Sequence, residues 1–316
     1  GAGMNRARGV ALIIALVVVA LATIFASRIG AEGALDQRRA TTLLAQEQAR
    51  QVAYGAEDWV MEILLQDAQH SQQVAMNQGW AMPMPPLPID GGEVAGRVED
   101  MAGRFNLNNL VTPQGTKNTF AFAWFQRLLA RLQLEPKWAS LVLDWIDPDN
   151  MADGPDGAED GVYLGMNPPY RPPNRPISST TELLSLPGFG LERYRRLQPF
   201  VAALPIGTPL NVCTASGMLL DTLGASVSAF AQDPKLLANY RAKGCFPTLK
   251  DVTTAVQGTL QPAEKQAALG LLAETSAWFR LTTQVRIGTT EVTLYSLLQR
   301  NPAGQSRVVL RSFGTE

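Results

Sequence analysis

The first 70 residues constrain the fold more than any other part of this chain. Residues 10–26 are apolar apart from Thr23, and two arginines precede them. A run of this length lies at the short end of what crosses a bilayer as a helix. The basic residues before it orient the N-terminus to the cytoplasm. The apolar run extends to Ile29 if residues 27–28 lie at the membrane interface.

The helical pattern does not stop where the apolar run ends. Between Ala31 and about His70 there is no proline, and apolar residues recur at spacings typical of a helix face. These residues are Leu35, Leu43, Leu44, Val52, Trp59, Val60, Ile63 and Leu64. A cleaved export signal would have a shorter apolar core followed by a cleavage site. We therefore predict one retained helix from Val10 to near His70, about 90 Å long at about 1.5 Å per residue.

The composition excludes several classes of function. The 316 residues carry a formal net charge of −1, which provides no electrostatic basis for binding nucleic acid. His70 is the single histidine in the sequence, so a zinc site built from several histidines is excluded. The two cysteines, Cys213 and Cys245, are either two buried thiols or, if the globular part is exported, one disulfide.

Alternating apolar and polar residues predict strands on both sides of a helical region. Residues 93–100 alternate, and residues 278–287 and 291–298 alternate on either side of a short turn, which predicts a hairpin. Residues 306–313 predict one more strand. The region 119–275 is dominated by helical patterns. The helical stretches are 120–134, 178–186, 191–204, 215–230 and 262–274.

The N-terminus resembles that of a known group of proteins. A short basic leader that ends at Gly9, followed by an apolar helix that becomes amphipathic, resembles the class III signal of type IV pilins and pseudopilins. The resemblance implies that a prepilin peptidase cuts after Gly9, so that Val10 is the first mature residue. Most members have a glutamate at the fifth mature position, where this chain has Ile14. The K-type minor pseudopilin of type II secretion lacks that glutamate, and residues 103–110 resemble its signature after the first sheet strand.

The resemblance implies a fold and a function. The expected fold class is α+β: a pilin-like long N-terminal helix packed on an antiparallel sheet, with a large all-helical domain inserted between strands. The expected role is that of a minor pseudopilin, not an enzyme, at the tip of the secretion pseudopilus with the I-type and J-type minor pseudopilins. The chain would cross the bacterial inner membrane once, with its globular part in the periplasm. Secreted substrates and the outer-membrane secretin are further expected contacts.

The expected units follow from this comparison. Residues 1–9 contain a cloning remnant before Met4 and the prepilin leader. The remaining units are the transmembrane part of the helix (10–29), its periplasmic part (30–80), the sheet (81–118 and 276–316) and the inserted helical domain (119–275), which contains an acidic loop at 144–161.

The acidic loop carries the densest chemistry. Seven carboxylates fall within 17 residues, among glycines and prolines that let the backbone turn on itself. They are Asp144, Asp147, Asp149, Asp153, Asp156, Glu159 and Asp160. So much negative charge is destabilising unless a cation neutralises it. Calcium fits best, because it takes about six to eight oxygen ligands and tolerates irregular geometry.

The loop is not an EF-hand. Counted from Asp149, a methionine occupies the third ligand position, and counted from Asp147, an alanine occupies the twelfth. The loop resembles instead the calcium loop of K-type pseudopilins, an Asp-Trp-x-Asp-x-Asp stretch followed by Gly-Ala-Glu-Asp. The preferred calcium ligands are Asp147, Asp149, Glu159 and Asp160, with Asp144, Asp153 and Asp156 as reserves.

Two other interpretations of the loop stay open. A solvated, disordered acidic loop is the simpler one, although the apolar residues on both flanks argue against it. Catalysis by paired carboxylates, as in glycoside hydrolysis, is the other. It ranks last because a loop rich in glycine and proline provides too little scaffold to set two different pKa values. No arrangement of nucleophile, base and oxyanion donors is visible in the sequence.

Residues 181–190 match a helix-hairpin-helix turn, whose glycine amides bind a phosphate in DNA-repair proteins. Arg193, Arg195 and Arg196 follow it. The alternative function is therefore a DNA-binding minor pilin of a competence or type IV pilus machine. The membrane anchor and the nearly neutral charge favour instead a hairpin that only packs two helices, and nucleic acid is not an expected partner.

Proteolytic processing tests the pilin interpretation. Because Gly9 precedes the apolar run, we expect removal of the leader on the cytoplasmic side and retention of the helix. Mass spectrometry of the mature protein from its native host should find Val10 at the N-terminus. An N-terminus beyond Ala26 would indicate cleavage by an ordinary signal peptidase and would contradict the interpretation.

Overall fold

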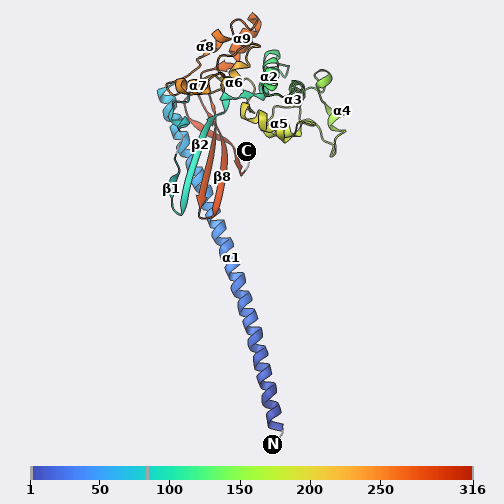
Figure 1. Cartoon of the computed structure of the whole chain (residues 1–316), viewed down its shortest axis with the longest axis vertical. Coiled ribbons are helices and arrows are strands. Elements are labelled where there is room, and N and C mark those ends of the chain that lie inside the picture. The colour runs from blue at the N-terminus through green and yellow to red at the C-terminus, as the bar shows by residue number, and fades with distance from the viewer. Residues whose placement is uncertain (1–2, 83–84, 315–316) are drawn as a thin grey trace.

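The chain folds into three parts, seen here in a computed structural model (Figure 1). The long helix α1 (Gly3–His70) projects away from the globular part, a five-stranded sheet packs on its second half, and an inserted unit lies at the end of the sheet farthest from the N-terminus. The structure describes the backbone of residues 3–82 and 85–314, and the side chains in these ranges except those of 3–9 and 11. The surroundings of Gly9 therefore lie outside the described residues.

Helix α1 is exposed in its first part and buried on one face in its second. Its apolar stretch has a mean hydropathy of 2.6 over 18 residues, is long enough to cross a membrane, and is 0% buried. Farther along, Ala49, Ala53, Val60 and Leu64 are buried at helical spacings, so they lie on one face. The prediction of one continuous helix that ends near His70 is confirmed.

The segment after α1 folds back along the helix. The carboxylate of Asp67 accepts hydrogen bonds at 3.3 and 3.0 Å from two backbone N–H groups of the 3-10 helix η1 (Gly79–Ala81). The Trp80 ring is buried edge-on against Phe279, with 5.5 Å between the ring centroids. Our expectation of a helical segment up to residue 80 is therefore wrong. The helix ends at His70, because these contacts hold the following segment against it.

The sheet has five antiparallel strands in the order β1-β2-β7-β8-β9. They are β1 (Leu87–Ile89), β2 (Gly92–Asp100), β7 (Trp278–Ile287), β8 (Thr290–Arg300) and β9 (Ser306–Phe313). The four strands predicted from alternation are all present, and residues 288–289 form the turn of the predicted hairpin. Sequence analysis did not predict β1, a three-residue edge strand that contains a proline.

Helix α1 packs on one face of the sheet through two apolar clusters. The cluster nearer the end of α1 contains Val60, Leu64, Val74, Trp80, Phe279, Leu281 and Leu298. The second contains Ala49, Ala53, Val285 and Leu294. Full burial of each larger aliphatic or aromatic side chain contributes about 1.5–3 kcal/mol. These clusters therefore fix the angle at which the anchor helix leaves the globular part.

The inserted unit occupies the chain between β2 and β7. Its first elements are η2 (Met101–Gly103), β3 (Phe105–Asn106), η3 (Leu107–Leu110), α2 (Thr119–Arg131), α3 (Trp138–Ile146), η4 (Gly154–Asp156), α4 (Asp160–Tyr163) and η5 (Thr180–Ser185). The others are α5 (Gly190–Leu197), η6 (Gln198–Phe200), β4 (Val201–Ala202), β5 (Leu210–Asn211), α6 (Gly217–Asp221), α7 (Pro234–Arg241), α8 (Leu249–Ala255), α9 (Pro262–Gly270) and β6 (Leu272–Ala273). One contiguous apolar core joins most of these elements, although η2, η4 and α7 contribute no residue to it.

The boundary between sheet and insertion differs from the expected one. We assigned residues 81–118 to the sheet, but Phe105, Leu107 and Leu110 are buried in the core of the inserted unit. The asparagine side chains of the signature at residues 103–110 explain why the boundary lies earlier. Asn108 Nδ2 donates to the carbonyls of residues 177 and 204, at 2.9 and 2.8 Å. The signature therefore ties together loops of the insertion, and the insertion begins directly after β2.

The inserted unit is not purely helical. Two short parallel strand pairs, β3 with β4 and β5 with β6, join its loops. The helix expected over 215–230 is also shorter, because α6 ends at Asp221. The carboxylate of Asp221 accepts three backbone hydrogen bonds from residues 229–231, all at 2.9 Å. These bonds turn the chain back where a longer helix would run on.

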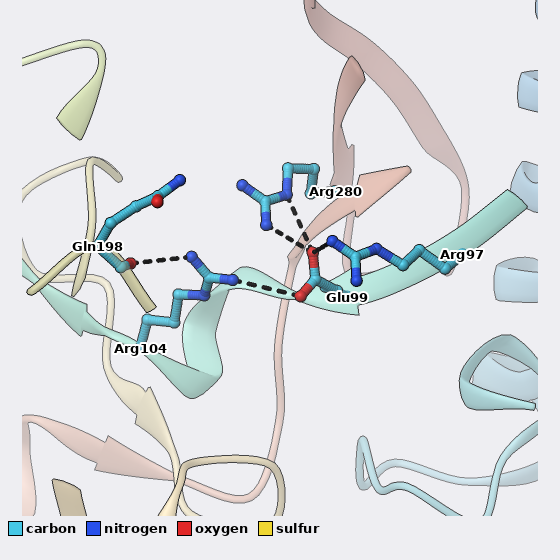
Figure 2. Close-up of polar contacts among 5 residues, drawn as sticks. All are labelled: Arg97, Glu99, Arg104, Gln198 and Arg280. Atoms are coloured by element: carbon cyan, nitrogen blue, oxygen red, sulfur yellow. Dashed lines mark hydrogen bonds and ion pairs between the residues drawn. The ribbon is translucent and has the colours of Figure 1, made fainter. Parts of the chain in front are cut away.

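Figure 2 shows the polar network where the sheet meets the inserted unit. Glu99 on β2 accepts hydrogen bonds from Arg280 on β7, at 2.5 and 3.2 Å, and from Arg104, at 3.3 Å. Arg97 lies 3.8 Å from the same carboxylate. Burial opposes ionisation of Glu99, but the arginines outweigh it and lower its pKa. Arg104 also donates to the backbone carbonyl of Gln198 at 3.2 Å, so the network links both units.

Asp100, the last residue of β2, makes a second link. Its buried carboxylate accepts hydrogen bonds from Asn211 Nδ2 (2.8 Å), Thr214 Oγ1 (2.6 Å) and the backbone N–H of Ala102 (2.9 Å). Asn211 Nδ2 also donates to the carbonyl of Val74, in the segment after α1, at 2.8 Å. Burial raises the pKa of Asp100. One carboxylate thus connects the sheet, the insertion and, through Asn211, the end of the anchor helix.

A disulfide joins Cys213 to Cys245 within the inserted unit. Their Cα atoms lie 4.7 Å apart across a sequence separation of 32 residues. The bridge connects the segment after β5 to the loop between α7 and α8. Closing a loop of this size is worth about 3 kcal/mol in the chain-entropy model. Two interpretations of the cysteines were open, two buried thiols or one disulfide, and the structure shows the disulfide.

Glu57 is a charged side chain buried between α1 and the sheet, with 1% of its surface exposed. Arg311 on β9 donates to both of its oxygens, from Nε at 2.9 Å and from Nη2 at 2.7 Å. Ser296 Oγ donates to the same carboxylate at 2.5 Å. The carboxylate therefore depends on Arg311 for its charge partner.

Replacing Arg311 should destabilise the fold. Arg311→Ala leaves the buried Glu57 carboxylate without its cation, which we expect to cost about 2–3 kcal/mol because the arginine itself is half-exposed. Arg307→Ala is the matched control, since Arg307 lies on the same strand and, within the described residues, its side chain bonds only Gln299. It should change stability by less than about 0.5 kcal/mol. Urea unfolding of the detergent-solubilised chain measures both, and equal effects would contradict a structural role for the pair.

Candidate metal centre

The acidic loop connects the end of α3 to the start of α4. Asp144 lies in the last turn of α3, Asp147 follows the helix directly, and Glu159 immediately precedes α4. The flanking Trp145 and Tyr163 are buried, with 5.4 Å between their ring centroids. The loop is therefore clamped at both ends by the core, which contradicts a disordered acidic segment.

Asp144 is the scaffold of the loop. Its carboxylate is fully buried and accepts backbone hydrogen bonds from Asp153 (3.0 Å) and Ala158 (2.7 Å). These bonds fold residues 153–158 over the end of α3. Gly157 is required there, because an added Cβ would overlap the Asp144 carboxylate. Asp144, which we expected only as a reserve calcium ligand, thus organises the loop by accepting hydrogen bonds from its backbone.

Three carboxylates converge beside this scaffold. Asp147, Asp149 and Glu159 each place one carboxylate oxygen so that all three lie within 4.8 Å of one another. Asp147 and Glu159 are buried, at 7% and 9% exposure, whereas Asp149 is exposed. The site is therefore open on the Asp149 side and closed on the other two.

Several oxygen atoms at this site have no hydrogen-bond donor. Among the described residues, the buried atoms without a partner include Asp147 Oδ1, Glu159 Oε1 and Asn174 Oδ1. The amide nitrogen of Asn174 donates to the carbonyl of Asp149 at 2.5 Å and approaches Glu159 Oε2 at 3.5 Å. Buried oxygens without donors are costly, so such a group of acceptors is suited to a cation.

The electrostatics lead to the same conclusion. Burial, with the neighbouring carboxylates, raises the pKa of Asp147 to about 7 and that of Glu159 to about 7. Burial also raises the pKa of Asp144 to about 6, although hydrogen bonds from two backbone N–H groups act to lower it. Without a cation, the cluster therefore resists carrying its full negative charge at neutral pH.

The donor set fits a hard divalent cation. Carboxylate and amide oxygens are ligands that calcium prefers, and three acidic groups provide the charge. Asp147, Asp149, Glu159 and the Asn174 amide oxygen would hold the ion. Bound there, it would neutralise the cluster and join the end of α3, the start of α4 and the segment around Asn174.

The same geometry argues against catalysis by paired carboxylates. An acid–base pair needs two carboxylates whose environments push their pKa values apart. Here the pKa values of Asp147 and Glu159 are raised to the same value, about 7, by the same cause. The two environments therefore assign neither residue the role of acid or of base.

The structure separates the other predicted ligands from this cluster. Asp160 pairs with Arg171 at 3.5 Å instead of joining the three carboxylates. Asp153 binds Lys117 Nζ at 2.8 Å and accepts from Ser140 Oγ at 2.9 Å. Asp156 is exposed in η4. Three of the four preferred residues converge, and none of the three reserves does.

Sequence analysis missed Asn174. It is 15 residues beyond Glu159, in a proline-rich stretch with no helical or strand pattern. Its backbone φ of 46° lies in the left-handed region, which asparagine tolerates better than most residues. A lone asparagine between prolines was the only available signal, and only the fold brings it to the acidic loop.

The helix-hairpin-helix segment shows why the DNA-binding alternative is weak. Arg193 donates to the carbonyls of Gly188 and Phe189, at 3.1 and 2.9 Å, and lies over the Trp138 ring. Arg196 pairs with Glu192 at 2.6 Å. Two of the three arginines that favoured phosphate binding are therefore engaged within the protein. Trp138 and Phe189 pack edge to face beneath the turn, as in a hairpin that only packs helices.

Comparison with known proteins identifies the family. Residues 103–206 match a family model described as type II secretion system protein K. Type II secretion system protein K of Pectobacterium carotovorum subsp. carotovorum is 33% identical over 325 residues, covering 98% of this chain and 97% of the relative. The protein K of Pseudomonas aeruginosa is 34% identical over 320 residues, covering 97% and 92%. The chain belongs to the type II secretion system protein K family.

A solved structure shares the fold of this protein K family member. It is the crystal structure of the GspK-GspI-GspJ complex from the type 2 secretion system of enterotoxigenic Escherichia coli. The matched chain is 22% identical, with a TM-score of 0.76, over 88% of this chain and 100% of that one. The expected α+β fold is thereby confirmed.

Removing divalent cations should destabilise the protein. A ligand that binds only the folded form stabilises it by about 2.7 kcal/mol at a hundredfold excess over its dissociation constant. We therefore expect a chelator to lower the melting temperature of the detergent-solubilised chain, calcium to restore it, and equal magnesium to restore less. Differential scanning calorimetry measures the shift.

Two variants make this test specific. Asp149→Ala with Glu159→Ala should abolish the calcium response, and should not lower the melting temperature of the metal-free protein, because it removes repelling charges. Asp156→Ala, outside the cluster, should keep the full response. An unchanged melting curve with chelator and calcium would show that the cluster is only a solvated acidic surface.

Proposed function

We propose that this chain is a minor pseudopilin that forms the tip of the type II secretion pseudopilus and nucleates its assembly. Membership of the protein K family and the fold support this role. The apolar start of α1 would anchor it in the inner membrane, and the sheet and insertion would lie in the periplasm. Its part in secretion would be structural, not enzymatic.

The position of the inserted unit is the observation that carries the proposal. It sits at the end of the sheet opposite the membrane anchor and extends beyond the width of the sheet (Figure 1). A filament subunit must leave its upper end free for the subunit above. In this chain the polar network around Glu99 and the Asp100 contacts fix the insertion over that end. Such a subunit can have neighbours beside and below it, and it ends the filament.

The fifth position of the mature helix supports the same role. A glutamate there would neutralise the free amine of a neighbouring subunit already in place above. Ile14 occupies this position and is 58% exposed on α1. A subunit without that carboxylate has no such interaction to offer, which suits the subunit that enters first.

We infer the partners of this chain from the solved structure that shares its fold. Its structure contains the GspK, GspI and GspJ chains in one complex. We propose that this chain assembles in the same way with the I-type and J-type minor pseudopilins of its own organism. Calcium at the acidic loop would then keep the insertion folded at the exposed tip. Secreted proteins and the outer-membrane secretin are the further contacts that such a position would allow.

Reconstitution tests the role. Coexpression of this chain with its I-type and J-type partners, extraction in detergent and size-exclusion chromatography should yield one ternary complex. The major pseudopilin of the same system is the matched control, and we expect it not to replace either partner. Elution of the three minor pseudopilins as separate species would contradict the proposal.

A DNA-binding measurement addresses the alternative. The engaged Arg193 and Arg196 lead us to expect no specific affinity for duplex DNA. A nanomolar affinity that weakens steeply with salt would instead favour a DNA-binding pilin.

A further inference from the structure

A cleft lies where the end of α1, the β8–β9 turn and the inserted unit meet. Its volume is about 590 Å³, within the range of about 300–1,000 Å³ typical of ligand sites. Its walls come from five separate segments: the end of α1 with the residues that follow it (68–72), Ala102 in η2, the loop 206–209, residues 275–278 at the start of β7, and the turn 300–304. It is separate from the acidic loop, none of whose residues line it.

Arg300 is the only charged side chain among the described residues that line the cleft. Its guanidinium donates to the backbone carbonyls of Leu64 (3.4 Å) and Ser276 (3.0 Å), and it makes no ion pair with any carboxylate in the described ranges. The carboxylates that influence it, Asp67 and Asp100, are already bound to other donors. The guanidinium also lies over the Phe279 ring, 5.1 Å from its centroid, and burial lowers the pKa of Arg300.

The wall beside Arg300 also offers an unused donor. The backbone N–H of the buried Ser276 has no acceptor among the described residues, although its carbonyl accepts from Arg300. Gln72, two residues beyond α1, is exposed and its side-chain amide makes no hydrogen bond within the described chain. Buried backbone N–H groups without acceptors are rare in native proteins. The cleft thus combines an incompletely compensated cation with unpaired donors.

These observations select a ligand rich in acceptors and negatively charged. A carboxylate can accept the remaining donors of Arg300, in the charge-assisted pairing that guanidinium favours. The carbonyls of an extended backbone can accept from Ser276 and Gln72. We propose that this cleft binds an extended peptide segment of another protein, with a carboxylate of that segment paired to Arg300. The inference does not depend on the tip role or on calcium.

Calorimetric titration of the full chain in detergent tests the proposal. The probe is the N-acetylated tripeptide alanyl-alanyl-glutamate, and its comparison peptide carries glutamine and a C-terminal amide in place of both carboxylates. We expect the acidic probe to bind with a dissociation constant on the order of 0.1–1 mM. The uncharged peptide should bind about 10- to 100-fold more weakly, the value of a charge-assisted hydrogen bond.

Three variants assign the binding to the cleft. Arg300→Met should weaken the acidic probe about 10- to 100-fold. Gln72→Trp, at an exposed position, should block the cleft while leaving Arg300 in place, and so decides the matter if Arg300→Met does not fold. Arg307→Met, on the neighbouring strand and outside the cleft, should bind as the unaltered chain does.

Four outcomes would overturn the proposal. They are no binding of the acidic probe at 10 times the expected dissociation constant, equal binding of the two peptides, unchanged binding by Arg300→Met or Gln72→Trp, and binding of free acetate as tight as that of the tripeptide. The last would indicate a small-anion site without a peptide groove. Failure here leaves the ternary complex unaffected, so the two proposals are tested separately.

Discussion

The buried carboxylate of Asp100 is the contact on which the arrangement of the parts depends. It ends β2, and its donors Ala102, Asn211 and Thr214 belong to the start of the insertion, to β5 and to the loop after β5. The shared partner Asn211 reaches the segment after α1. Because β2 and β7 pair along their whole length, from Gly92↔Ile287 to Asp100↔Phe279, both ends of the insertion leave the sheet side by side. A long insertion is then tolerated at little entropic cost.

The carboxylates of this protein divide into those satisfied by the fold and those that it leaves unsatisfied. Asp144 and Asp221 organise turns through backbone N–H groups, and Glu57 and Glu99 are paired with arginines. Asp147 and Glu159 have no such partners for their buried oxygens. The same residue types therefore serve as structural anchors or form a candidate metal site, according to whether hydrogen-bond donors or only other carboxylates surround them.

The apolar start of α1 and the candidate sites lie in different parts of the molecule for a physical reason. The apolar part of α1 does not pack on the sheet. Its described side chains are exposed on every face, as suits a helix surrounded by lipid or by neighbouring helices. The second half of α1 buries one stripe and leaves the other side polar. The carboxylate cluster and the disulfide lie within the insertion, and the cleft lies where the insertion meets the sheet and the end of α1.

The sequence by itself determined the elements that depend on local pattern. The periodicity of α1, the alternation of β2, β7, β8 and β9, and the concentration of carboxylates in the acidic loop are all readable along the chain. Only the tertiary structure decided which carboxylates converge, that Asn174 joins them, and that the asparagine-rich signature belongs to the insertion. It also placed Arg300 in a cleft built from five segments of the chain. Spacing within one element fixes a side chain's face, whereas convergence depends on hydrogen bonds and packing between segments far apart in sequence, which no local pattern records.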